Sequence, residues 1–213
     1  MYKLINAEHL STMNFIKFVQ SISEFELLNE QDRLTLVKFN LYFSIVIHDP
    51  LIFDPNTELW YSNHDKINST SASEKILAQR FKNLYTICFG HELIQECIAV
   101  NHALIKLTNN DPMIIQLLMI IVIFLKGLSL DENPSSILID TKTVLHIQLK
   151  YIDLLIRYLL QRISFENCVI KMLHVVEQIL KLQKLSQKFL SQFKTKFDLS
   201  NVHPLTKTFL HLT

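Results

Sequence analysis

The stretch FVQSISEFELLNEQDRLTLVK, which spans Phe18–Lys38, decides the fold of this chain. It reads as the end of one helix, a short turn and the start of a second helix. Three apolar residues around the turn are spaced so that one buried seam can hold them: Ile22, Phe25 and Leu28. Asn29 can cap the second helix, with Asp32 three residues later as a short-armed capping box. The stretch therefore predicts two helices joined at a tight, buried corner.

The composition around this stretch favours helices and a sizeable core. The chain has 213 residues, of which 49% are hydrophobic and 19% charged, a balance that is not typical of disorder. Only Gly90 and Gly127 are glycine, whereas sheet proteins and phosphate-binding folds need many tight turns. The net charge of +1 gives no electrostatic reason to expect nucleic acid as a direct partner.

Cysteine usage and hydropathy limit the setting of the protein. Cys88, Cys97 and Cys168 form no CxxC pair, which favours a reducing compartment and buried thiols. Met1–Leu10 has no apolar run of the kind found in a signal peptide. The most apolar segment, Met113–Leu125, is too short to cross about 30 Å of hydrocarbon, so we expect a buried central helix and no membrane partner.

Periodicity and capping signals predict about eight helices with one small hairpin. The expected helices cover Ile5–Ile22, Glu30–Ile47, Glu74–Phe89, Glu92–Thr108, a segment from Pro112 to Gly127, Asp140–Arg162, Phe165–Phe197 and His203–Leu212. The expected hairpin lies in Leu51–Asn63, around an Asp54-Pro55-Asn56 turn. The predicted fold class is all-α, a three-layer antiparallel helical sandwich with one small β-hairpin, built as a single domain over residues 1–213.

No catalytic constellation is present, and we predict neither an enzyme nor a cofactor. His91-Glu92 begins a zinc-protease pattern, but Gln95 stands where the second imidazole is needed. The glycine clusters of nucleophile elbows and phosphate loops are missing. The remaining candidates are read as ordinary surface or core residues: His102, His146 and His174 on separate helices, the Glu92–Glu96 pair, and the lysines of the last long helix.

The Phe18–Lys38 stretch resembles the signature of the nuclear receptor ligand-binding domain. That signature places an aromatic seven residues before Phe, then Leu, Asp-Gln and Leu-Leu-Lys. The corresponding residues here are Phe18, Phe25, Leu28, Asp32-Arg33 and Leu36-Val37-Lys38. The order and approximate length of the later elements also agree, including the hairpin and the buried mid-domain helix. The resemblance implies a ligand-binding domain of a transcription regulator that acts in the nucleus.

The resemblance also implies a pocket for a lipophilic molecule between helices. By register, its wall would include Leu4, Glu8, Ser11, Tyr42, Ile45, Ile52, Leu59, Trp60, Phe189 and Leu190. Each of these could equally be ordinary core. A buried Glu8 would need a partner, so a rotated helix with Glu8 facing water is preferred. Ile52 occupies the place of an arginine that fixes acidic ligands in some members, which argues against an acid-headed ligand.

A coregulator groove would be closed by the tail helix Pro204–Leu210. Its expected residues are Gln20, Arg33, Lys38, Leu205, Thr208 and Phe209. The family holds a Leu-rich partner helix by a lysine and a glutamate at the two ends of that helix. Here these places fall on Gln20 and Thr208, so coregulator binding is expected to be weak or altered.

The long helices at Asp140–Arg162 and Phe165–Phe197 resemble the pair that forms the family's dimer face. We therefore expect a homodimer or a heterodimer with another nuclear receptor. The first helix of the family domain and its zinc DNA-binding module lie outside this sequence, which is expected to be a truncated domain. The alternative prediction is a helical module that dimerises through Cys168–Phe197 and holds no ligand.

Overall fold

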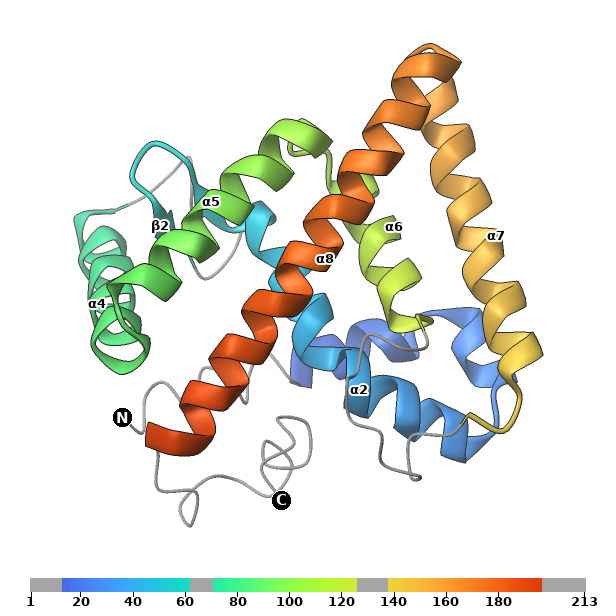
Figure 1. Ribbon diagram of the computed structural model, residues 1–213, viewed down its shortest axis with the longest axis horizontal. Helices are drawn as coiled ribbons and strands as arrows, with labels where there is room; N and C mark the ends of the chain where they lie inside the picture. Colours follow the sequence, from blue (N-terminus) through green and yellow to red (C-terminus); the bar gives the residue numbers. More distant parts are fainter. Residues whose placement is uncertain (1–12, 62–70, 126–137, 197–213) are drawn as a thin grey trace. The chain divides into compact units, whose positions relative to one another are not determined.

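The computed structural model describes residues 13–61, 71–125 and 138–196 (Figure 1). These residues form helices and one two-stranded antiparallel sheet. The predicted all-α class with a small hairpin is therefore confirmed. The predicted tail helix, the segment around Gly127 and the first part of the opening helix lie outside the described residues.

The chain divides into two compact units, and each is built from separate stretches of sequence. Unit 1 comprises Met1–Ile45, Gln116–Ile163 and Asp198–Thr213, and unit 2 comprises Val46–Ile115 and Ser164–Phe197. Each unit is described here by itself. The single domain and the three-layer arrangement stay predictions.

Unit 1 is organised around a short 3-10 turn and the helix that follows it. Residues 13–20 are helical, η1 spans Ser23–Leu27, and α2 spans Glu30–His48, the last three residues of which belong to unit 2. The three apolar residues of the predicted seam are all buried: Ile22, Phe25 and Leu28. The predicted helix–turn–helix is confirmed, with α2 extending one residue beyond the expected end.

Helix α2 is buried on all sides after its second turn. Among the side chains described from Thr35 to His48, every one is buried or half-buried. The expected apolar helix is thus confirmed, except that Leu34 is 61% exposed. Leu34 lies on the same side of the first turns as Glu30 and Gln31, which are also exposed. Two polar residues, Asn40 and Ser44, are also fully buried, which apolar patterning did not indicate.

The buried amide of Asn40 bonds the backbone at the end of helix α6. Helix α6 spans Pro112–Ile123, so it stops earlier than the expected end at Gly127. Asn40 donates from Nδ2 to the carbonyl oxygens of Ile123, at 2.9 Å, and Leu125, at 3.1 Å. The last carbonyls of a helix have no partner within the helix, and this amide supplies one. Nearly all side chains from Ile114 to Phe124 are buried, as expected for a central helix.

Unit 2 begins with the predicted hairpin. A 3-10 turn, η2 (Asp49–Leu51), leads into β1 (Phe53–Asp54) and β2 (Leu59–Trp60). The register pairs Phe53 with Trp60. Asp54 organises the loop, because its carboxylate accepts hydrogen bonds from the Asn56 N–H at 2.9 Å and the Thr57 hydroxyl at 2.7 Å.

Helices α4 and α5 follow the hairpin and meet at Gly90. Helix α4 spans Ala72–Phe89 and α5 spans His91–Thr108. The start of α4 was expected at Glu74, but Ser71 and Glu74 form a capping box that starts it at Ala72. Gly90 has φ 90° and ψ 155°, a conformation reserved almost entirely for glycine, and its N–H bonds the Thr86 carbonyl at 2.9 Å. Gly90 therefore ends α4, as predicted.

Two long helices complete the described residues. Helix α7, in unit 1, spans Thr141–Leu160 and is capped by Asp140, which accepts from the Thr143 N–H at 3.0 Å. Helix α8, in unit 2, spans Phe165–Lys196 and packs on α5, where Lys188 pairs with Glu96 at 2.6 Å. Both helices were expected, with ends within two residues of those found.

Candidate functional site

The first candidate site is the corner between η1 and α2, in unit 1. The Asp32 N–H donates to Asn29 Oδ1 at 2.9 Å, so the predicted cap is confirmed. The Asp32 carboxylate has no exposed surface and accepts from Asn29 Nδ2 at 2.7 Å. It also accepts from the backbone N–H groups of Ile139, at 2.6 Å, and Asp140, at 2.9 Å. Asp32 therefore ties the start of α2 to the start of α7.

A second carboxylate fixes the same corner from the other side. Glu24 in η1 accepts from Lys150 and from the Tyr151 hydroxyl, both on α7, the latter at 2.6 Å. The Lys150 and Tyr151 hydrogen bonds lower the pKa of Glu24 to about 2. Burial and the adjacent Glu24 carboxylate raise the pKa of Tyr151. The phenol stays protonated and serves as a hydrogen-bond donor rather than as a proton acceptor.

Aromatic packing completes the corner. The Phe124 ring lies 6.3 Å from the Phe25 ring, edge on, and 6.3 Å from the Tyr151 ring, nearly parallel. Pairs at such separations add to the apolar burial of each ring. Two signature residues are therefore linked to α7. Phe25 contacts it through Phe124, and Asp32 is hydrogen-bonded to the backbone at its start.

The second candidate site is the hairpin region of unit 2, which contains five of the predicted pocket residues. Leu59 and Phe189 are buried, whereas Ile52, Trp60 and Leu190 are half-buried. The Trp60 ring lies 5.0 Å from the Phe53 ring, tilted by 50°, and packs with Ile94 and Ile98 of α5. Leu59 points to the opposite face of the hairpin and packs with Tyr61 and Ala78. Leu59 and Trp60 therefore do not share one wall.

Tyr85 connects the hairpin cluster to the predicted pocket residue on α8. It packs against the cluster around Phe53 and lies 6.1 Å from the Phe189 ring. Phe189 in turn stacks on Phe89 with a centroid separation of 3.9 Å. Trp60 and Phe189 thus contribute to one continuous aromatic region of unit 2, filled at Phe89 by direct ring stacking.

The other predicted pocket residues lie outside unit 2 or outside the described residues. Tyr42 and Ile45 lie on the part of α2 that belongs to unit 1, and Ile45 is half-buried. Leu4, Glu8 and Ser11 lie outside the described residues. Whether the ten residues share one pocket therefore stays a prediction.

Several buried polar atoms in unit 2 have no hydrogen-bond partner among the described residues. They are Trp60 Nε1, Tyr61 Oη, Asn101 Oδ1, Asn110 Oδ1, Gln178 Oε1 and Ser186 Oγ. An unpaired buried donor or acceptor costs about 1–3 kcal/mol, so such atoms commonly meet water or a ligand. Trp60 Nε1 belongs to the aromatic region that the sequence predicted as pocket wall.

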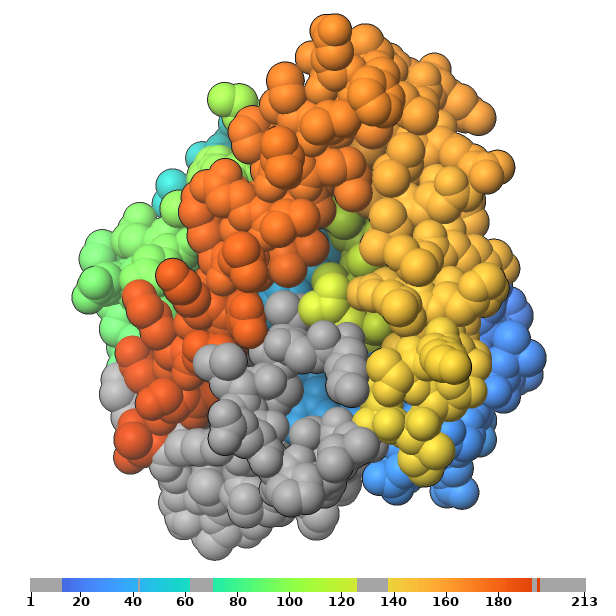
Figure 2. All heavy atoms as spheres, turned by 45° about the vertical axis from the view of Figure 1, so that its right-hand side comes forward, coloured from blue at the N-terminus to red at the C-terminus, as the bar shows by residue number. Residues whose placement is uncertain are grey.

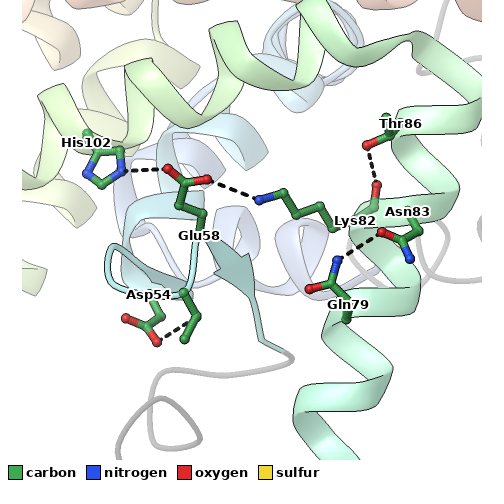
Figure 3. Close-up of polar contacts among 8 residues, drawn as sticks. Asp54, Glu58, Gln79, Lys82, Asn83, Thr86 and His102 are labelled. Atoms are coloured by element: carbon green, nitrogen blue, oxygen red, sulfur yellow. Dashed lines mark hydrogen bonds and ion pairs between the residues drawn. The ribbon is translucent and has the colours of Figure 1, made fainter.

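Glu58, in the hairpin loop, makes polar contacts with α4 and α5 (Figure 3). Glu58 has φ 53°, which is uncommon for a residue other than glycine, and its carboxylate lies between α4 and α5. One oxygen pairs with Lys82 Nζ at 3.2 Å, and the other lies 3.8 Å from His102 Nε2. The sequence predicted a hairpin around the Asp54-Pro55-Asn56 turn but did not indicate these contacts of Glu58.

The predicted coregulator groove is represented by three residues of unit 1. Gln20 is exposed, whereas Arg33 and Lys38 are half-buried on α2. The Lys38 ammonium lies 5.6 Å from the centre of the Phe39 ring. Leu205, Thr208 and Phe209 lie outside the described residues, so the groove itself stays a prediction.

The described residues include no candidate metal site, and the Cys97 thiol is not activated. Those residues contain no group of three or more His, Cys, Asp or Glu side chains able to hold a metal ion. Burial, followed by the charges of Asp49 and Glu96, raises the pKa of Cys97 to about 12, which makes this thiol a poor nucleophile.

Membrane insertion and sequence comparison add little to this picture. Among the described helices none is both long and apolar enough to span a membrane alone; α5 and α6 reach the required length and hydropathy only as a bent pair.

No family model matches the chain. No curated protein matches it either.

Proposed function

We propose that this chain is the ligand-binding and dimerisation domain of a nuclear-receptor-type transcription regulator. The observation that supports this most directly is the corner at the start of α2. The resemblance was drawn from residues that include Phe25, Leu28 and Asp32. All three are buried there, and Asp32 bonds the backbone at the start of α7. The motif therefore makes long-range interactions in addition to starting a helix.

The proposed ligand is lipophilic and uncharged, and it binds beside the hairpin of unit 2. The aromatic region around Phe53, Trp60 and Phe189 offers apolar surface, worth about 25 cal/mol for each Å² that ligand burial removes from water. Trp60 Nε1 is a donor without a partner among the described residues, so a carbonyl or ether oxygen suits it. With Ile52 in place of an arginine, an acidic head group has no counter-ion there.

Native mass spectrometry of the purified chain tests the ligand proposal. We expect a co-purified lipophilic molecule, whose occupancy falls in a Trp60→Ala variant. The matched control is Ile87→Ala, since Ile87 is 80% exposed on α4, and this change should leave occupancy unaltered. A wild-type chain that binds no such molecule from a lipid extract would contradict the proposal.

The proposed coregulator contact is weak, because Gln20 and Thr208 replace the two charged residues of the family's clamp. Titration with a Leu-rich helical peptide should give little binding to the wild type. Gln20→Lys should strengthen binding, whereas a matched Ser21→Lys change on the neighbouring exposed residue should not. Tight wild-type binding that depends on Thr208 would refute this part of the proposal.

A second candidate function is a helical dimerisation module without a ligand. It is favoured by a row of apolar side chains on α8 that are exposed although the helix is otherwise packed. The two candidates separate on the mass spectrum, because a dimer without bound lipophile fits only the second. Neither candidate includes catalysis.

A further inference from the structure

Helix α8 is apolar on two opposite faces. One face packs within unit 2 and contains Cys168, Val175, Leu182, Leu185 and Phe189, all buried. On the other face five apolar side chains are 43–71% exposed: Phe165, Val169, Leu173, Val176 and Leu180. The first half of α8 lies at the surface in Figure 2. Their spacings of four, four, three and four residues place them in one row along the helix, here called the outer row.

Two charges flank the outer row on the same side. Glu166 and Lys184 are both exposed, and neither has an ionic partner within the described parts of the chain. They are 18 residues apart (184 − 166), which is five turns at 3.6 residues per turn and about 27 Å along the axis. By contrast, Lys181 pairs with Glu177 at 2.7 Å and Lys188 pairs with Glu96 at 2.6 Å.

The positions of these two charges select a partner and an orientation. In two parallel copies of α8, related by a two-fold axis along the helices, the flank that carries Glu166 and Lys184 would lie at opposite edges of the interface, so these charges would not meet. Two antiparallel copies related by a two-fold axis near residue 175, midway between them, would set Glu166 of each copy against Lys184 of the other. Leu173, the middle member of the outer row, lies two residues, or about 3 Å, from that axis. The antiparallel arrangement therefore aligns the apolar row and both ion pairs at once.

We propose that the outer row of α8 binds the same row of a second copy of this chain, antiparallel, with reciprocal Glu166–Lys184 ion pairs. An interface of this kind is self-complementary, as two-fold symmetry requires. This inference rests on the dimerisation part of the proposed function and does not involve a ligand.

Sedimentation equilibrium on the full chain tests whether the outer row forms the interface. The wild type should be a reversible dimer, and Leu173→Asp should make it monomeric without loss of helical circular dichroism. Val176→Asp provides a second variant at another position of the row. The control Ile87→Asp alters an exposed apolar residue of α4 and should remain dimeric. A wild type that is monomeric at its highest soluble concentration would overturn the inference and the second candidate function, whatever the ligand result.

Charge reversal then tests the orientation. Glu166→Lys and Lys184→Glu should each raise the dimer dissociation constant about fivefold or more, because each change affects two symmetry-related pairs. The double variant E166K/K184E should restore wild-type affinity. In a parallel dimer these charges would lie at opposite edges of the interface and would not meet, so single reversals that leave the dissociation constant unchanged would overturn the antiparallel arrangement while dimerisation stands.

Discussion

At the scale of the residue, the most specific interactions of unit 1 are made by a fully buried carboxylate, Asp32, and a half-buried one, Glu24. Asp32 accepts three hydrogen bonds and Glu24 is held by Lys150 and Tyr151. The sequence indicated Asp32 as a capping residue, but its bonds to Ile139 and Asp140 cross more than a hundred positions. No local pattern carries information about such a contact. The role of Glu24 was missed for the same reason.

Asp32→Asn should destabilise the protein by about 2–3 kcal/mol. An amide has one accepting oxygen, so one of the N–H groups of Ile139 and Asp140 would face an amide donor and lose its bond. Urea unfolding measures this as a lower midpoint at unchanged slope. The control Asp153→Asn removes only an exposed pair with Arg157 and should cost less than about 0.5 kcal/mol. Equal effects of the two substitutions would show that the Asp32 bonds add little.

Glu24 should make stability depend on acid. Its pKa is lowered from 4.5 to about 2, so the ionised form stabilises the fold fully above pH 4.5. This contribution is lost progressively as the pH falls from 4.5 towards 2. Allowing for solvent around Lys150, it amounts to about 1–2 kcal/mol. In urea melts at pH 6 and pH 3, Glu24→Gln should show a smaller loss on acidification than wild type, whereas the exposed neighbour change Glu26→Gln should not. The same acid loss in Glu24→Gln would contradict this.

At the scale of the element, local signals predicted most helices and strands to within a few residues. Asn29 and Asp140 cap α2 and α7 as expected, and Gly90 ends α4. The errors fell where distant contacts decide. Helix α6 ends at Ile123, before the expected Gly127, and the Ile123 carbonyl accepts from the buried amide of Asn40 on another helix. Leu34 was expected to be buried but is exposed. Apolar periodicity does not indicate where along a helix the packing begins.

Gly90→Ala should cost about 1–3 kcal/mol through the backbone alone. An added methyl would meet no atom within 4 Å, so no clash contributes. The cost comes from φ 90° at a residue with a Cβ. Thermal unfolding should show a lower midpoint. The matched control is Asn109→Gly, since Asn109 has φ 54° and glycine accepts that angle without strain, so its stability should be close to wild type. A neutral Gly90→Ala would mean that the corner can relax to a negative φ.

At the scale of the whole molecule, the prediction of fold class was confirmed, whereas the predicted pocket stays a prediction. Trp60 and Phe189 lie in one aromatic region through Tyr85, whereas Leu59 faces the other side of the hairpin. A register taken from one motif fixes which element a residue belongs to. It does not fix which way a two-residue strand turns its side chains, and this is why Leu59 and Trp60 separate.

The two units should unfold in a single transition. Helices α2 and α6 each have residues in both units, so neither unit keeps its full set of helices when the other opens. Trp60, the chain's single tryptophan, reports on unit 2, while far-ultraviolet circular dichroism reports on all helices. We expect their urea curves to coincide. A fluorescence change well separated from the loss of helix would contradict this.

The bond between Asp32 and residues 139–140 also has a consequence for synthesis on the ribosome. At roughly 5–20 residues per second, the carboxylate emerges several seconds before the N–H groups that donate to it have been synthesised. During this interval Phe25 and Leu36, which are buried in the folded chain, are exposed to other macromolecules near the ribosome. The nascent chain is therefore expected to need a chaperone until residues 139–140 have been synthesised. Rare codons after residue 50 would lengthen this interval.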